Sequence, residues 1–135
     1  MTERRRIRPI GVLGILLVDA VLVVVFALVG RSSHAEGLDP AGVWGTAWPF
    51  LAGLAVGWLV ALGWRHPLAV WPTGIVAWAG TLVVGMLLRV ASGQGAALAF
   101  IIVAALTLAV LLIGWRSVAW LVGRRTRERV EAGVR

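Results

Sequence analysis

One ionisable side chain, Asp19, lies in the middle of the first long apolar stretch, residues 10–29. An ionised carboxylate at the centre of a membrane helix costs about 2.5–3.5 kcal/mol on insertion scales. Each surrounding Leu, Ile, Val or Phe offsets about 0.3–0.6 kcal/mol, so the helix still inserts. Asp19 is therefore expected to face the interior of a helix bundle. Two roles fit it there: a proton or cation site, or a hydrogen-bonding anchor between helices.

The partners of Asp19 can be predicted from depth in the bilayer. If successive helices alternate in direction, the level of Asp19 also contains Trp58, Thr81 and Thr107. Trp78 lies one turn away. Indole N–H and threonine hydroxyl groups are natural donors to a buried carboxylate. We therefore expect these four side chains to surround Asp19.

A polar loop at residues 30–42 carries Arg31, His34, Glu36 and Asp39. His, Glu and Asp can bind metal ions, but their spacing here matches no zinc motif, and the chain has no cysteine. No metal and no cofactor are therefore expected. A salt-bridge network, or a pH-sensitive gate through His34, is the preferred interpretation of this loop.

Arg89 ends a stripe of small and polar residues along the third apolar stretch: Gly74, Trp78, Thr81, Gly85 and Arg89. Such a stripe faces other helices or a cavity. Arg89 either reaches outer headgroups or pairs internally with Glu36, Asp39 or an anionic ligand. The internal role is preferred, because an outer arginine opposes the positive-inside bias. The predicted ligand- or ion-binding residues are Asp19, Arg31, His34, Glu36, Trp58, Trp78, Thr81, Arg89 and Thr107.

Four apolar stretches would position these residues. They predict an all-α integral membrane bundle with helices at about 10–30, 44–64, 72–90 and 96–122. The whole chain is expected to form one transmembrane domain with a basic cytoplasmic tail at 123–135. The basic start could suggest a secretory signal, but the first apolar stretch is too long and contains Asp19. It is therefore interpreted as a retained membrane helix.

The distribution of arginine predicts the orientation of the bundle. The chain has 13 Arg and no Lys, and ten of the 13 lie in the first eight or last 20 residues. This pattern indicates topology and not nucleic-acid binding, because cytoplasmic ends of membrane helices collect positive charge. Counted from Arg116, the C-terminal segment holds six arginines. Both termini are therefore expected in the cytoplasm, in a multi-pass protein of the cytoplasmic (inner) membrane.

Glycine spacing predicts close helix contacts. Gly53 and Gly57 form a GxxxG pair in the second apolar stretch, and Gly85 lies on the stripe of the third. Small residues at this spacing let two helix backbones approach closely. The contact could be intramolecular or could join two copies of the chain.

Several short motifs in order resemble the domain of unknown function 3054 family of bacterial and archaeal membrane proteins. They are GRSSHAEGL, TAWPFLAGLAVGW, WPTG, GMLLR followed by GQG, and a closing GWR. The resemblance extends from about Asp19 to Arg116. It implies four transmembrane helices and no assigned activity. It gives weight to Asp19, Arg31, His34, Glu36, Trp48, Pro49, Arg89 and Gly95.

Three functions fit these features. The preferred hypothesis is a homo-oligomeric transporter or channel in the lipid bilayer, with an outward-facing polar site above Asp19 and an unknown ligand. The alternative is a non-catalytic accessory or scaffold subunit of a membrane complex. An intramembrane enzyme using His34 or Glu36 is least favoured. No phosphate-binding loop, Ser-His-Asp set or HExxH motif is present, so no catalytic residue is assigned and no enzyme is expected.

Overall fold

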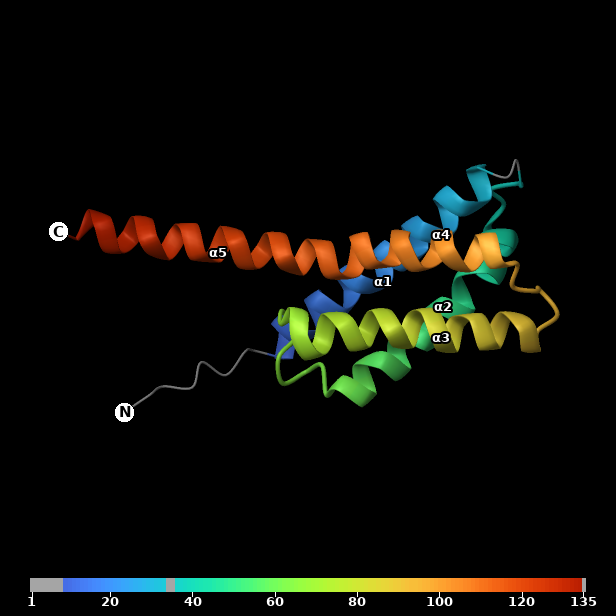
Figure 1. Ribbon diagram of the computed structural model, residues 1–135, viewed down its shortest axis with the longest axis horizontal. Helices are drawn as coiled ribbons and strands as arrows, with labels where there is room; N and C mark the ends of the chain where they lie inside the picture. The colour runs from blue at the N-terminus through green and yellow to red at the C-terminus, as the bar shows by residue number, and fades with distance from the viewer. Residues whose placement is uncertain (1–8, 34–35, 135) are drawn as a thin grey trace.

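The computed structural model describes residues 9–33 and 36–134, which form an all-helical bundle (Figure 1). Its elements are α1 (Pro9–Ser33), α2 (Pro40–Ala61), η1 (Val70–Gly74), α3 (Ile75–Ala91), α4 (Leu98–Leu108), η2 (Ala109–Ile113) and α5 (Gly114–Gly133). Because α4, η2 and α5 are continuous, four helical segments are long and apolar enough to cross a membrane. The predicted all-α bundle of four membrane-spanning helices is confirmed.

The lateral surface of the bundle is apolar. Large aliphatic side chains from every membrane-spanning segment are more than half exposed, among them Leu17, Val60, Leu87 and Leu106. A monomeric water-soluble protein rarely exposes so much contiguous apolar surface. These side chains are suited to contact lipid, as expected for a multi-pass membrane protein.

Both ends of α2 differ from the predicted 44–64, for local reasons. The helix begins at Pro40 because the Asp39 side chain accepts a hydrogen bond from the Gly42 backbone N–H at 2.8 Å. Proline at the first helical position needs no such partner. The helix ends at Ala61, since Leu62 adopts a left-handed conformation with φ 51°.

α2 and α3 form the closest pair of helices in the bundle, and glycine makes this possible. A Cβ atom on Gly53 would lie 2.7 Å from the Gly80 carbonyl oxygen, and one on Gly57 would lie 2.9 Å from the Ala77 Cα. A Cβ on Gly85 would lie 2.6 Å from the Phe50 ring. Within one chain, the GxxxG pair therefore lies at an intramolecular contact between α2 and α3.

The two ends of the bundle differ in character. α1 begins at the end from which α5 projects, and we call this the termini end (Figure 1). The opposite end, which we call the far end, carries the α1–α2 and α3–α4 connections. The helix Leu98–Gly133 has 36 residues, which is about 54 Å against a hydrocarbon core of about 30 Å. Its segment 123–133, predicted as a basic tail, is helical and fully exposed.

Candidate functional site

Asp19 lies at the centre of a buried charge network. Its carboxylate forms a bidentate salt bridge with Arg116, with Nη2–Oδ2 and Nη1–Oδ1 distances of 2.6 and 2.8 Å. Trp58 Nε1 donates to Oδ2 at 2.8 Å and Trp115 Nε1 to Oδ1 at 2.9 Å. Both charged side chains have an exposed fraction of 0%. Each carboxylate oxygen therefore accepts two hydrogen bonds and faces no solvent.

Arg116 is held from its own side as well. Its Nε donates to the Pro67 carbonyl at 3.1 Å, and its Nη1 also donates to the Leu112 carbonyl at 2.9 Å. Leu112 belongs to η2, a wide turn in which the Gly114 N–H bonds to the Ala109 carbonyl five residues earlier. Wide turns of this kind are frequent where a helix positions functional side chains. Here the wide turn directly precedes Trp115 and Arg116, both of which reach Asp19.

The role of Arg116 corrects the sequence interpretation. The sequence grouped it with the topological arginines of the C-terminal segment, whereas the structure places it inside the bundle, 97 residues along the chain from its partner Asp19. Trp115, the residue before Arg116, also donates to Asp19. The sequence held one signal for a buried cation, which was Asp19 itself. A buried carboxylate is costly unless a cation or a proton neutralises it.

The other predicted donors to Asp19 make different bonds. Trp78 Nε1 donates to the Ala105 carbonyl at 2.9 Å, which ties α3 to α4. Thr81 Oγ1 donates to the Ala77 carbonyl of its own helix at 2.7 Å, a common bond for threonine within helices. Thr107 is half-buried, and among the described residues it donates no hydrogen bond to Asp19. Of the four predicted donors, only Trp58 reaches the carboxylate.

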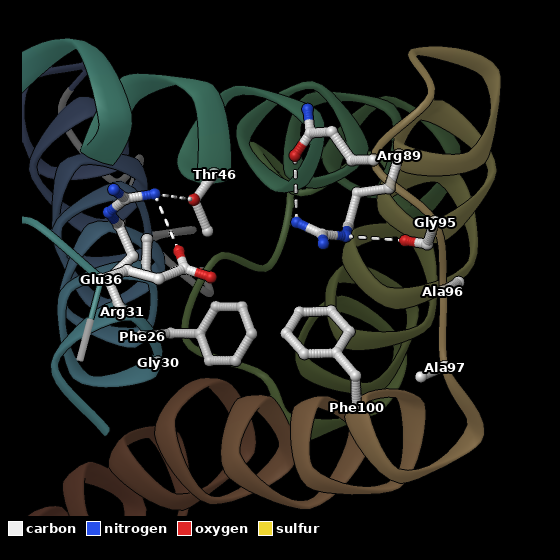
Figure 2. A pocket seen from close by; sticks show the side chains of 12 residues that line it. Phe26, Gly30, Arg31, Glu36, Thr46, Arg89, Gly95, Ala96, Ala97 and Phe100 are labelled. Atoms are coloured by element: carbon white, nitrogen blue, oxygen red, sulfur yellow. Dashed lines mark hydrogen bonds and ion pairs between the residues drawn. The ribbon is translucent and has the colours of Figure 1, made fainter. Parts of the chain in front are cut away.

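A separate cavity of about 570 Å³ opens at the far end, and we call it the far-end pocket. Its walls come from the end of α1, the start of α2, the end of α3 and the start of α4 (Figure 2). Its lining includes two aromatic and three charged side chains: Phe26, Phe100, Arg31, Glu36 and Arg89. The volume is typical of a site for an organic small molecule.

Arg31 holds one wall of the far-end pocket together. Its Nη1 lies 3.0 Å from Glu36 Oε2 and 3.3 Å from Thr46 Oγ1, and its Nη2 lies 3.8 Å from Asp39 Oδ1. Its Nε donates to the Gly37 carbonyl at 2.8 Å. These bonds fasten the loop after α1 to the start of α2. Two carboxylates thus face the single positive charge of Arg31.

Arg89 forms the opposite wall, and no carboxylate of the described residues forms a salt bridge with it. Its Nη1 donates to Gln94 Oε1 at 3.1 Å and its Nε to the Gly95 carbonyl at 3.3 Å, both neutral acceptors (Figure 2). Its guanidinium carbon lies 4.5 Å from the centroid of the Phe100 ring. No salt bridge joins Arg89 to an acidic group within residues 9–33 and 36–134. The predicted pairing of Arg89 with Glu36 or Asp39 is therefore not seen, because both carboxylates lie nearer to Arg31.

Aromatic rings close the floor of the far-end pocket. Phe26 and Phe50 meet edge to face with centroids 5.1 Å apart, and Phe100 lies 6.3–6.4 Å from both. Phe26 is two helical turns from Asp19, about 10 Å along α1. The far-end pocket and the buried charge network are thus separate, which differs from the single site that the sequence predicted. His34 lies outside the described residues.

The described residues of the far-end pocket offer groups that can recognise a small molecule. Within the described part of the chain, no three His, Asp or Glu side chains gather closely enough to hold a metal ion. The pocket instead presents two guanidinium groups, an amide, a carboxylate and two aromatic rings. Such groups bind and orient a small organic molecule.

Comparison with known proteins gives one match. A family model described as "Protein of unknown function (DUF3054)" matches residues 16–119, which confirms the resemblance carried by the sequence motifs. No curated protein and no solved structure matches the chain significantly. The matched span includes Asp19 and Arg116 of the charge network and Arg31, Glu36 and Arg89 of the far-end pocket.

Proposed function

The chain belongs to the DUF3054 family of proteins of unknown function, and we propose that it is a small homo-oligomeric transport protein whose solute enters at the far-end pocket. The observation that carries the proposal is the pocket itself, about 570 Å³ with Arg89 on its wall. An arginine that pairs with no carboxylate is expensive at a membrane protein's apolar surface and is normally functional. We assign the protein binding and passage of a solute, not catalysis.

The charge network has a supporting role in this proposal. A carboxylate that accepts four hydrogen bonds at zero exposure has no lone pair left to bind a passing cation. We therefore assign Asp19 and Arg116 to anchoring α1 against the last helix. The aromatic floor separates them from the far-end pocket. The solute path would then run between α1 and α4, or between copies of the chain.

A flux assay in liposomes tests the proposed function. We expect the reconstituted protein to pass at least one of four probes: protons, potassium, chloride or the organic anion carboxyfluorescein. Arg89→Gln should lower that flux about tenfold or more, because a charge-assisted hydrogen bond to a solute contributes about 1.5–3 kcal/mol. Arg65→Gln is the matched control, since Arg65 is exposed in the loop at the termini end. Four fluxes equal to those of protein-free liposomes would contradict transport.

An accessory or scaffold role is the second candidate, and α5 favours it. The segment 123–133 extends beyond the other helices and is exposed along its whole length (Figure 1). A free helical projection can dock against a partner subunit. Removal of residues 123–135 should then release a co-purifying membrane complex, whereas a transporter that works alone should keep its flux.

We further propose that the termini end faces the cytoplasm, because most arginines belong to the segments at that end. The chain has no cysteine, so single cysteines report exposure without interference. Ser33→Cys lies at the far end and Thr126→Cys in the α5 projection, and both positions are exposed. A membrane-impermeant maleimide should label only Ser33→Cys in intact cells. Labelling of Thr126→Cys alone would reverse the orientation.

A further inference from the structure

We infer that the far-end pocket binds an amphipathic organic anion, with a phosphate or carboxylate group against Arg89 and an apolar group over the aromatic floor. This inference rests on the proposed function, because it names the solute class that the same pocket would take.

The salt-bridge pattern of the far-end pocket favours an anion at Arg89. Arg31 already lies against two carboxylates, Glu36 at 3.0 Å and Asp39 at 3.8 Å. Arg89 contacts only the neutral acceptors Gln94 and Gly95. Among the described residues, the pocket guanidinium that forms no salt bridge is therefore that of Arg89, whose planar donors suit a carboxylate or phosphate.

The surroundings of Arg89 hold its guanidinium in place for such a contact. Gln94 accepts from Nη1, and the Gln94 amide in turn donates to the Gly45 carbonyl of α2 at 3.1 Å. The Phe100 ring lies beneath the guanidinium at 4.5 Å. These contacts leave Nη2 without a hydrogen-bond acceptor among the described residues. A ligand would therefore meet a pre-organised donor, which lowers the entropic cost of binding.

The floor and the volume favour an apolar group on the ligand. Phe26 and Phe100 present their rings beneath the two arginines in Figure 2, and both line the pocket. An inorganic phosphate would fill a minor part of about 570 Å³ and would leave these rings in contact with water. Covering them contributes about 25 cal/mol for each Å² of apolar surface removed from water. The ligand therefore combines an anionic head with an apolar body.

Binding of dodecyl phosphate tests this inference, measured by scintillation proximity on the full chain in phosphatidylcholine nanodiscs. We expect saturable binding that is about tenfold or more weaker in Arg89→Gln and unchanged in the Arg65→Gln control. Inorganic phosphate should bind at least about tenfold more weakly than dodecyl phosphate, since it lacks the apolar group. Equal affinity of the two phosphates, or equal affinity of Arg89→Gln and wild type, would overturn the inference.

A second variant keeps the test informative if Arg89→Gln fails to fold. Gly30 lines the pocket, and a Cβ added there meets nothing within 4 Å, so Gly30→Leu should fill the pocket without disturbing the helix. Gly14 on the same helix is equally open and lies outside the pocket, so Gly14→Leu is its control. Dodecyl phosphate should bind more weakly to Gly30→Leu only. Equal binding by both variants would place the ligand elsewhere.

Bilayer composition distinguishes two sources of the anion. If phosphatidylglycerol displaces dodecyl phosphate from the wild type, the ligand is a lipid headgroup with its chains. If it does not, the ligand is a free organic anion; either result keeps the inferred chemistry.

Failure of the inference is separable from failure of the proposed function. Arg89-dependent flux without dodecyl phosphate binding would leave transport standing and remove the amphipathic anion.

Discussion

Replacing Asp19 by asparagine is expected to lower the free energy of unfolding by about 3–5 kcal/mol. Arg116, with an exposed fraction of 0%, would keep its charge inside the bundle without a counter-ion. Neutral interhelical hydrogen bonds in membranes average only about 0.6 kcal/mol, so their loss alone would give a much smaller change. The size of the effect therefore distinguishes an ion pair from an ordinary polar contact. Unfolding by SDS titration in mixed micelles measures it.

Two further variants show whether the effect comes from the pair. The double variant Asp19→Asn/Arg116→Gln removes both charges and keeps amide groups that can bond to each other, so it should recover a large part of the lost stability. Arg65→Gln changes an exposed arginine and should change stability by less than about 0.5 kcal/mol. A double variant no more stable than Asp19→Asn would contradict the assignment of these residues as an anchoring pair.

The sequence predicted the architecture because the bilayer imposes a simple rule. A helix that spans the hydrocarbon core needs about 20 apolar residues, and four such stretches are visible. The ends of the helices were harder to place, since local groups decide them. Asp39 starts α2 at Pro40, and Leu62 stops it after Ala61. α5 continues beyond residue 122 to Gly133. The apolar stretch ends at residue 122, so apolar composition could not predict where the helix itself ends.

The partners of Asp19 were harder to predict than its depth. Charge counting treats every arginine near a terminus alike, so Arg116 was grouped with arginines that lie in water. The direction of the Arg116 side chain depends on how the last helix is rotated about its own axis. The wide turn η2 changes this rotation just before Arg116. Thr81 satisfied its hydroxyl within its own helix, through the Ala77 carbonyl at 2.7 Å. Sequence spacing cannot weigh such a local acceptor against a distant carboxylate.

For the far-end pocket, too, the location of the residues was predictable and their pairing was not. Arg31, Glu36 and Arg89 were predicted to lie together at one end, and all three line one cavity. Their pairing was not predictable, because the carboxylate of Glu36 could reach either arginine from a loop. Gln94 was not among the predicted site residues, whereas its side chain links Arg89 to the Gly45 carbonyl. Neutral residues that orient a charged one leave little trace in composition or periodicity.

Substituting Gly57 by alanine is expected to destabilise the bundle by about 1–3 kcal/mol, although alanine favours helices. The added Cβ would lie 2.9 Å from both the Ala77 Cα and the Val76 carbonyl oxygen. These are backbone atoms, so no side chain can move aside, and α2 and α3 must separate. Gly57→Leu should cost more, because its whole side chain needs room between the helices.

Gly45→Ala on the same helix is the matched control, since a Cβ there meets nothing within 4 Å. It should leave stability unchanged or raise it slightly, because alanine restricts the unfolded chain more than glycine does. SDS titration measures both variants. If Gly57→Ala were as stable as the control, the close α2–α3 approach would be wrong. If Gly57→Ala instead changed only the oligomeric state in native-like membranes, the GxxxG pair would belong to a contact between copies.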